Sequence, residues 1–316
     1  MSHRLTEDAK GVFIISATPF ADDGALDEAS LDSLTDFYLG HGVTGITILG
    51  MMGEAPKLTA AESVSVLSRV LKRVDGRVPV IVGVSNAGLD NLLTLARTSM
   101  DHGAAGVMIA PNAGHKTETG VIAAFKTISD RLPDVPLVFQ DFPLSTQMPI
   151  SADAFTRLVE EVPSVVMLKH EDWPGLQKLT AVRETAAKRG ARRVSILTGN
   201  GGLYLPQELA RGADGAMTGF AYPEMLVEVV RRHQAGDADG AEDLFDAYLP
   251  IVRHEQQPGF GLAVRKEILR RRGAIRSATA RAPGPKLDAA GHEELTRLMQ
   301  RMERALESVA PAMAAE

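Results

Sequence analysis

Residues 43–84 read VTGITILGMMGEAPKLTAAESVSVLSRVLKRVDGRVPVIVGV and contain one complete strand–helix–strand unit. Two short runs rich in valine and isoleucine, 43–49 and 78–84, predict buried strands. Between them, the apolar residues of 60–74 recur with the spacing of an amphipathic helix. This arrangement predicts two parallel strands joined by a helical crossover.

The same unit repeats along the chain. Further strands are predicted at 12–17, 106–110, 135–140, 165–169, 194–198 and 215–218. Further helices are predicted at 30–39, 89–102, 117–132, 152–161, 175–188, 203–211 and 223–233. Eight strand–helix units over roughly 235 residues match the usual size of a parallel (β/α)8 TIM barrel, an α/β fold of about 250 residues. A doubly wound open sheet is the alternative, because periodicity does not show closure.

The β pattern stops after residue 233, and only helical spacing follows, at 237–254, 261–272 and 289–306. A connector rich in proline and glycine, 282–285, separates the last two helices. The sequence thus predicts a catalytic barrel at residues 1–235 and a C-terminal helical extension at 236–316, packed on the barrel.

Composition excludes several classes of function. The 316 residues include no cysteine, which rules out disulfides, thiolate catalysis and cysteine metal sites. A net charge of −6 gives no general attraction to nucleic acid, and the eight histidines show no metal-ligand spacing. The polar N-terminal segment and the lack of an apolar run of about 20 residues lead us to expect a cytoplasmic protein without a membrane partner.

Lys169 closes the predicted strand VVMLK at 165–169. Keeping an amine charged at the end of a buried apolar strand costs free energy, and a neutral lysine is a nucleophile for carbonyl carbons. A structural lysine gives the same pattern if it reaches solvent or pairs with Glu171 or Asp172. Lys169 is therefore a candidate catalytic residue, with the structural role as the alternative.

A turn after the second strand is the next candidate. Gly50 and Gly53 bracket Met51 and Met52, directly before Glu54. Glycines at a strand end allow backbone N–H groups to converge on an anion such as a carboxylate. A tight turn with packed methionines is an equally good interpretation of these residues.

The remaining candidates follow strands five, seven and eight, where such barrels carry their function. Strand alternation places either Gln140 or Asp141 at the barrel mouth, unless the segment is only a strand-ending turn. The glycine-rich loops lack the lysine and serine of a nucleotide-binding loop, so they indicate only room for a ligand. The ligand-binding candidates in these loops are Gly199, Asn200, Thr218 and Gly219.

Several motifs occur in a fixed order over residues 11–300. They are ATPF at 17–20, GMMGE at 50–54, GRVPVIVGV at 76–84, Lys169, GADG at 212–215, and Lys266, Gly273 and Arg281-x-Pro283. This set resembles the dihydrodipicolinate synthase / N-acetylneuraminate lyase family. The resemblance implies a homo-oligomeric barrel, a tetramer or dimer, that acts on small 2-oxo acids and needs no cofactor beyond a covalent imine on its lysine. It assigns that imine to Lys169, carboxylate binding to the turn at 50–53, and adds Thr18 as a substrate-binding candidate.

The departures from this family are informative. The turn after strand two carries methionines where the family has hydroxyl residues, and Gln140 stands where it keeps a proton-transferring tyrosine. Ser145 replaces the arginine that clamps the second substrate of the synthase. The chain has only four tyrosines, none at a predicted strand end. These differences argue against lysine biosynthesis.

Three other motifs resemble the branch of the family that dehydrates 2-keto-3-deoxy sugar acids. They are QDFP at 140–143, GAMTG at 215–219 and LPIVRHE at 249–255. We therefore expect a lyase that forms a Schiff base and dehydrates a 2-keto-3-deoxy acid or cleaves it by a retro-aldol reaction. The alternatives are 4-hydroxy-tetrahydrodipicolinate synthase, which joins pyruvate to aspartate semialdehyde, and a barrel that binds a 2-oxo acid without turnover.

Without a tyrosine, another group must transfer protons. Residues i and i+2 of a strand share a face, so Glu171 is expected beside Lys169 as the general base, with Asp141 as the second choice. A charge partner that only orients Lys169 is the structural alternative.

The sequence also predicts the character of the pocket and the position of a basic run. Met51, Met52, Phe142 and Phe220 predict a pocket that is more apolar than a sugar-acid site. The basic run at 265–272, interleaved with apolar residues, is expected to face solvent or an interface.

Overall fold

The computed structural model describes residues 4–112 and 114–313. Its strands form one closed barrel in which every strand pairs in parallel with its sequence neighbours, and β1 pairs with β8. Closure confirms the (β/α)8 barrel and excludes the open sheet. The strands are β1 Gly11–Ile15, β2 Gly45–Ile48, β3 Val80–Gly83, β4 Gly106–Ile109, β5 Leu137–Asp141, β6 Val165–His170, β7 Ser195–Thr198 and β8 Gly215–Ala216.

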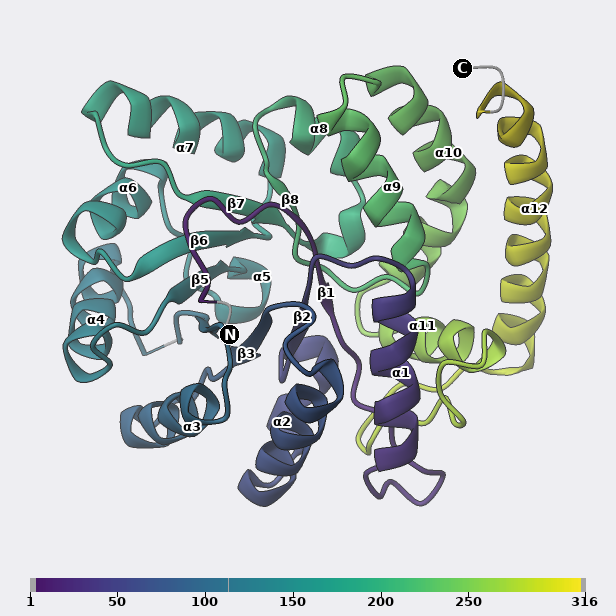
Figure 1. Ribbon diagram of the computed structural model, residues 1–316, viewed down its shortest axis with the longest axis horizontal. Coiled ribbons are helices and arrows are strands. Elements are labelled where there is room, and N and C mark those ends of the chain that lie inside the picture. Colours follow the sequence, from purple (N-terminus) through teal and green to yellow (C-terminus); the bar gives the residue numbers. More distant parts are fainter. Residues whose placement is uncertain (1–3, 113, 314–316) are drawn as a thin grey trace.

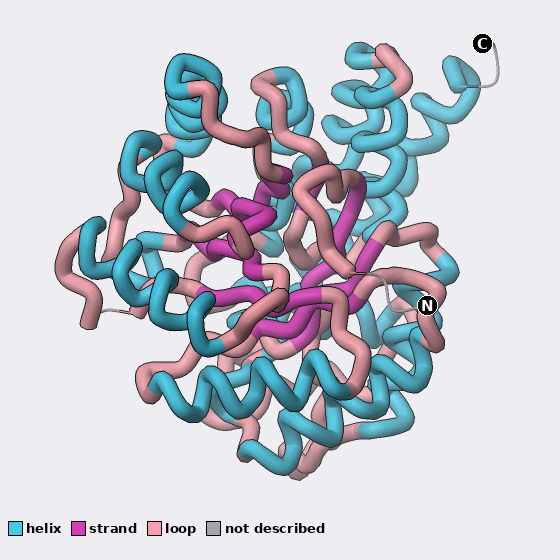
Figure 2. Tube along the Cα trace, turned by 60° about the vertical axis from the view of Figure 1, so that its left-hand side comes forward, coloured by secondary structure: helices cyan, strands magenta, loops and turns pink. Residues whose placement is uncertain are grey.

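A ring of helices surrounds the strands (Figures 1 and 2). Each predicted crossover helix is present, and the helices are α1 Glu28–Gly40, α2 Ala60–Val74, α3 Leu89–Asp101, α4 Glu118–Arg131, α6 Ala152–Glu161, α7 Gly175–Arg189, α8 Leu205–Ala210 and α9 Pro223–Gln234. Side-chain caps fix several starts. In α2, Thr59 and Glu62 form a reciprocal capping box.

Short elements that the periodicity did not predict lie at the C-terminal ends of the strands. They are the 3-10 turns η1 Met51–Gly53, η2 Ala55–Lys57 and η3 Asn200–Gly202, and the one-turn helix α5 Pro143–Thr146. A single turn spans too few residues for an apolar period to show. These turns shape the mouth of the barrel.

The barrel is a packed core with two apolar layers. The interior cluster includes Phe13, Ile15, Met108, Met167 and Met217. Leu5 joins it, and its N–H donates to the Ala105 carbonyl at 2.9 Å, at the end where the strands begin. The second, larger cluster fills the space between strands and helices. Because the interior is filled with side chains, a ligand can enter only at the opposite end, where the strands finish.

Three helices follow the barrel: α10 Ala238–Glu255, α11 Gly261–Arg271 and α12 Ala289–Met313. Helix α10 packs against α9 and α12, and the three lie together on one side of the barrel (Figure 1). Helix α11 approaches the strand ends, where Lys266 Nζ lies 2.5 Å from Glu54 Oε1. The predicted extension is thus present and reaches the barrel mouth.

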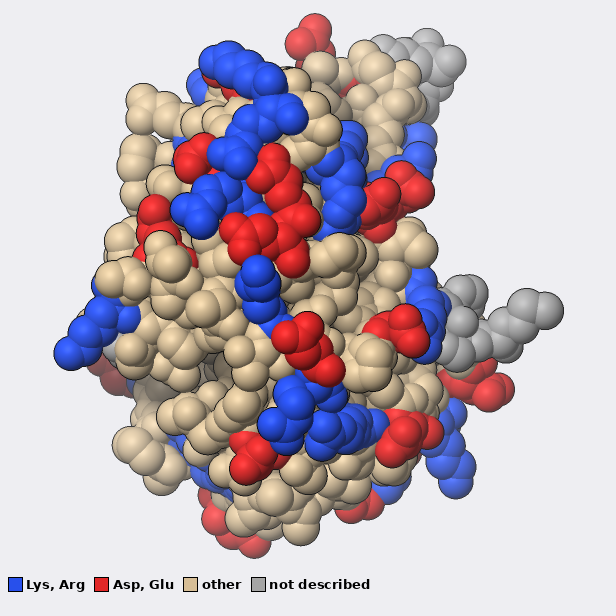
Figure 3. Space-filling view, turned by 90° about the vertical axis from the view of Figure 1, so that its left-hand side faces the viewer, with Lys and Arg blue, Asp and Glu red and all other residues tan. Residues whose placement is uncertain are grey.

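Charged groups on the outer helices are largely paired. Arg189 at the end of α7 bonds to Asp153 and Glu160 of α6, and Lys126 of α4 lies 3.1 Å from Glu161. On the face shown in Figure 3, acidic and basic side chains accordingly lie in adjacent clusters.

No helix among the described residues is long and apolar enough to cross a membrane.

Candidate active site

A cavity of about 650 Å³ opens where the strands end, and it contains the predicted lysine. Residues from the ends of β1, β5 and β6 line it together with the loops after β2, β7 and β8. The segment from the end of α10 into α11 closes one side. The polar lining residues are Gln140, Ser145, Lys169, Glu171, Asn200, Thr218, Glu255, Gln256, Gln257 and Arg265.

Lys169 and Glu171 lie side by side in this cavity. Lys169 Nζ is 2.9 Å from Glu171 Oε2, and both residues are buried. Gln140 Nε2 donates to the same carboxylate oxygen at 2.8 Å. The strand register explains the group, because Gln140 is the direct neighbour of Lys169 across β5 and β6. The expected contact between Lys169 and Glu171 is therefore present.

A glycine on the next strand makes room for Glu171. A side chain at Gly199 would place its Cβ only 2.3 Å from Glu171 Cγ. The carboxylate thus occupies the interior position that residue 199 leaves empty. Gly199 itself does not line the cavity, whereas Asn200 does, and Asn200 Nδ2 donates to the Glu171 carbonyl at 3.3 Å. Gly199 therefore positions the Glu171 carboxylate and does not contact the cavity itself.

The second choice of base, Asp141, points away from the cavity. Strand alternation turns its side chain outward, where Lys178 Nζ of α7 lies 2.5 Å from Oδ2 and His170 Nδ1 lies 3.8 Å from the same oxygen. This geometry corrects the expectation for Asp141. Asp141 belongs to a buried charge cluster between β6 and α7.

The turn after β2 is fixed by its own hydrogen bonds. The N–H groups of Gly53 and Glu54 donate to the carbonyls of Gly50 and Met51, each at 3.0 Å, and Thr18 Oγ1 donates to the Gly53 carbonyl at 2.6 Å. Met51 and Met52 line the cavity. Gly50, Gly53 and Thr18 lie behind that lining, so Thr18 positions the turn and has no place on the cavity wall.

The loops after β7 and β8 are joined to each other. The Gly201 N–H donates to Thr218 Oγ1 at 2.7 Å, which fixes the hydroxyl predicted to bind substrate. Thr218 and Gly219 line the cavity, as does Gly201. These contacts form a rigid wall two strands away from Lys169.

The sequence interpretation missed the contribution of the C-terminal segment. Arg265 and Lys266 were expected on a solvent or interface face, but they are 2% and 0% exposed. Arg265 lines the cavity, while Lys266 holds Glu54 beneath the β2 turn. The apolar spacing of α11 describes a buried helix equally well, and only tertiary contacts show which cations are enclosed. The segment Gln256–Gln257 was missed because no periodic pattern marks a loop.

The rim of the cavity is apolar. Phe142, Leu144, Trp173 and Leu203 line it with the two methionines, and Leu144 is 70% exposed. The predicted apolar character is thus present, with one correction. Phe220 lies in the core behind β8 and contacts Tyr222 and Tyr248 there.

No tyrosine is among the residues that line the cavity. Tyr38, Tyr222 and Tyr248 are buried elsewhere, and desolvation raises the pKa of Tyr38 and of Tyr248 to about 12. Tyr204 packs edge-on against Trp173 outside the lining. The ionisable side chains that line the cavity are therefore Lys169, Glu171, Glu255 and Arg265. The described residues contain no cluster of acidic residues and histidines suited to a metal ion.

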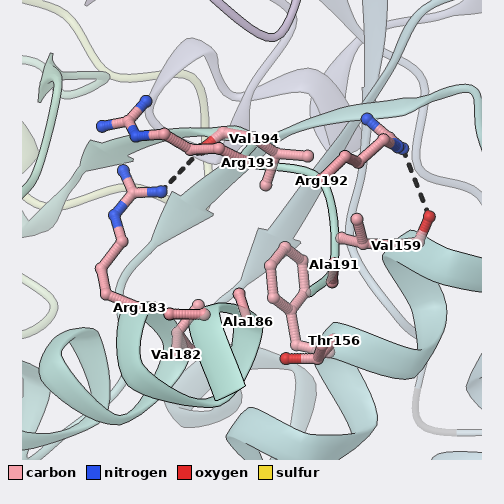
Figure 4. Close-up of a pocket in the computed structure, with 11 residues that line it drawn as sticks. Thr156, Val159, Val182, Arg183, Ala186, Ala191, Arg192, Arg193 and Val194 are labelled. Carbon is pink, nitrogen blue, oxygen red and sulfur yellow. Dashed lines mark hydrogen bonds between the residues drawn. The ribbon is translucent and has the colours of Figure 1, made fainter. Parts of the chain in front are cut away.

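A second cavity, of about 270 Å³, lies between α6 and α7 near the start of β7 (Figure 4). Three arginines border it, and each already has partners. Arg183 Nη1 donates to the Val194 carbonyl at 2.8 Å, Arg192 pairs with Glu7, and Arg193 pairs with Asp214. The remaining lining is mostly apolar, so this cavity offers no reactive constellation.

The fold and the cavity define a (β/α)8 barrel of the kind that carries its chemistry at the strand ends, here with a buried lysine–carboxylate pair. The family model described as the dihydrodipicolinate synthetase family matches residues 8–302. The chain belongs to this family, whose members are lyases, and is a lyase itself.

The relatives of this chain carry two different named activities. An L-2-keto-3-deoxyarabonate dehydratase of Azospirillum brasilense is 30% identical over 307 residues, covering 96% of this chain and 97% of the relative. A 4-hydroxy-tetrahydrodipicolinate synthase of Sorangium cellulosum is 31% identical over 300 residues, covering 93% and 96%. A crystal structure of dihydrodipicolinate synthase from Rhodopseudomonas palustris superposes with a TM-score of 0.92 at 48% identity, covering 95% and 100%.

Proposed function

We propose that the protein is a Schiff-base lyase that dehydrates a 2-keto-3-deoxy acid or cleaves it by a retro-aldol reaction. One observation carries the proposal: in the barrel cavity, Lys169 Nζ lies 2.9 Å from Glu171 Oε2. A nucleophilic amine and a base in contact are what imine chemistry on a ketone needs. The residues require no added cofactor.

The steps follow from these two groups. Glu171 takes a proton from the Lys169 ammonium, and the neutral amine attacks the ketone carbon of the substrate to give a carbinolamine. Glu171 then returns the proton to the carbinolamine hydroxyl, which leaves as water and leaves an iminium. The resulting iminium withdraws electrons from the neighbouring carbon, from which Glu171 then removes a proton. The electron pair forms an enamine, which expels the hydroxyl of the following carbon. Glu171 gives this hydroxyl the proton it took from carbon, so that water leaves and the iminium is restored. Hydrolysis of the imine releases the product and restores Lys169.

Gln140 and the β2 turn act as positioning groups in this scheme. Gln140 Nε2 donates to Glu171 Oε2, which holds that oxygen toward Lys169. Met51 and Met52 of the turn at 50–53 line the cavity, and we assign substrate carboxylate binding to this corner. Asn200, Thr218 and Gly219 form the wall facing the substrate chain.

Synthase activity is the second candidate, because two relatives named as synthases are 31% and 48% identical to this chain. The cavity wall lacks a tyrosine, and Ser145 lines the rim at the position expected to clamp the aldehyde substrate. These features favour dehydration or cleavage. Condensation of pyruvate with aspartate semialdehyde above background would favour the synthase.

Borohydride trapping tests the proposal. We expect reduction in the presence of 2-oxo acids to attach the acid to Lys169, because hydride converts the imine into a stable secondary amine. Peptide mass mapping locates the adduct. Lys169→Arg keeps the positive charge beside Glu171 but should form none. A wild-type protein that gives no adduct with any acid of a broad panel would refute the mechanism.

A further inference from the structure

Arg265 of α11 carries an unpaired donor in the wall of the cavity. The residue is 2% exposed and lines the cavity that holds Lys169. Its Nε pairs with Glu255 Oε1, and Nη2 donates to the Gly219 carbonyl at 2.6 Å. Nη1 is buried and has no hydrogen-bond partner among the described residues. A buried guanidinium donor left unpaired is unfavourable, so it calls for a ligand.

Gly219 explains how this group reaches the barrel interior. A Cβ at residue 219 would lie 2.0 Å from Arg265 Nη1 and 2.6 Å from Cζ. Position 219 follows Met217, an interior residue, by two, so the guanidinium fills an inward-facing position that glycine leaves open. Gly199 does the same for Glu171 on the neighbouring strand. Two glycines thus admit one carboxylate and one guanidinium to the barrel mouth.

The guanidinium and the β2 turn lie on opposite sides of one residue of β1. Ile15, at the end of β1, lies between them: its carbonyl would be 3.0 Å from a Cβ at Gly219, and its Cγ2 3.6 Å from one at Gly50. This is the turn in which methionines stand where hydroxyl residues are expected in the family. A planar donor from α11 can supply the hydrogen bonding that those methionines cannot.

The contacts of Arg265 occupy Nε and Nη2 and leave Nη1 available to bind a ligand. Glu255 Oε2 accepts from the Ala221 N–H at 3.2 Å while its other oxygen faces Arg265, so the carboxylate is held in place and keeps the guanidinium fixed. Nη1, which donates to none of the described residues, is therefore part of a fixed guanidinium and lies against Gly219. Charge-assisted donation from such a group favours carboxylate oxygens over neutral acceptors.

Building on the proposed function, we propose that Arg265 Nη1 binds the carboxylate of the 2-oxo acid and positions its ketone for Lys169. The residue makes no bond to the reacting carbon. It acts as an anion anchor, selecting acids over the corresponding neutral ketones.

Calorimetric titration with pyruvate and with pyruvamide tests this assignment, because the two ligands share the ketone and differ in the carboxylate. Two variants alter the anchor differently. Arg265→Lys keeps a positive charge beside Glu255 but has no Nη1, and Gly219→Ala displaces Nη1 while leaving Arg265 in the chain. We expect each to weaken pyruvate binding about ten- to a hundred-fold, the loss of one charge-assisted hydrogen bond, and to leave pyruvamide affinity unchanged.

Arg270→Met is the matched control, since it removes an outward-facing guanidinium from the same helix and should change neither affinity. Circular dichroism checks that each variant is folded. Unchanged pyruvate binding in both folded variants, equal weakening of both ligands, or no preference for pyruvate in the wild type would overturn the assignment. Borohydride reduction of the same samples separates the two proposals. If pyruvate binding depends on Arg265 but borohydride reduction gives no adduct on Lys169, only the imine mechanism is refuted.

Discussion

Glu171 has two contacts that define its place at the residue scale. Its Oε2 faces Lys169 Nζ at 2.9 Å and accepts from Gln140 Nε2 at 2.8 Å, while its side chain fills the space at Gly199. A carboxylate held in this way can shuttle a proton between the amine and the carbon next to the imine. If Glu171 only paired with the charge of Lys169, no group would remove the proton from the carbon next to the imine.

Glu171→Gln separates these roles. We expect kcat to fall about 10²- to 10⁴-fold, the usual contribution of a general base, and trapping at Lys169 to become slower, because the amide cannot take the proton of the ammonium. The amide preserves the shape, so Gly199 still accommodates it. Gln140→Ala, which removes only the orienting contact, should have a smaller effect. Turnover of Glu171→Gln at the wild-type rate would remove Glu171 from the base role.

At the scale of elements, Glu208 of α8 is an unusual buried carboxyl group that lies near Thr198 of β7 and His170 of β6. Burial raises the pKa of Glu208 from its ordinary 4.5 to about 7, against the opposing effects of Thr198 and His170. Burial alone would lower the pKa of His170, but the Asp141 carboxylate and the Gly175 carbonyl outweigh it and raise that pKa. Asp141 in turn contacts Lys178, so charges of both signs lie behind the strand that carries Lys169.

Glu208 gives the fold a pH dependence with a defined sign. Because the folded-state pKa is about 7 and the ordinary value 4.5, the folded protein retains a proton that the unfolded chain releases. Its contribution to stability is complete below pH 4.5 and is lost as the pH rises toward 7. Glu208→Gln stays neutral, so relative to the wild type its free energy of unfolding should rise across this window by up to about 3 kcal/mol. Urea unfolding at a series of pH values measures the difference, and a difference that does not change with pH would contradict the assignment.

At the scale of the whole molecule, the C-terminal helices are part of the catalytic end. Arg265 lines the cavity, Lys266 holds Glu54 under the β2 turn, and Arg281 pairs with Glu62 at 2.7 Å. Arg272 lies over the rings of Phe37 and Tyr222. A barrel of residues 1–235 would lose the partners of several buried groups at once.

We therefore predict that the chain ended after residue 235 does not fold cooperatively, because Glu54 and the carbonyls of Gly219 and Ala221 lose their cationic partners. The full chain should unfold in one transition, seen identically by circular dichroism and by fluorescence of the single tryptophan, Trp173. Two separated transitions would show that 236–316 is an independent unit.

The tetramer or dimer implied by resemblance stays a prediction, and a monomeric dihydrodipicolinate synthase variant, 25% identical with a TM-score of 0.84, is among the similar structures. Sedimentation measures the oligomeric state.

Sequence alone determined the order of strands and helices, because apolar periodicity records which face of each element is buried. It also placed Lys169 at a strand end and Glu171 on the same side, since alternation along a strand is local. Tertiary structure decided the rest. The pairing of β5 with β6 decided that Gln140 and not Asp141 faces the cavity, and Gly219 leaves the space in which the Arg265 guanidinium lies. Both outcomes depend on contacts between distant segments, and no local period encodes which buried charge meets which partner.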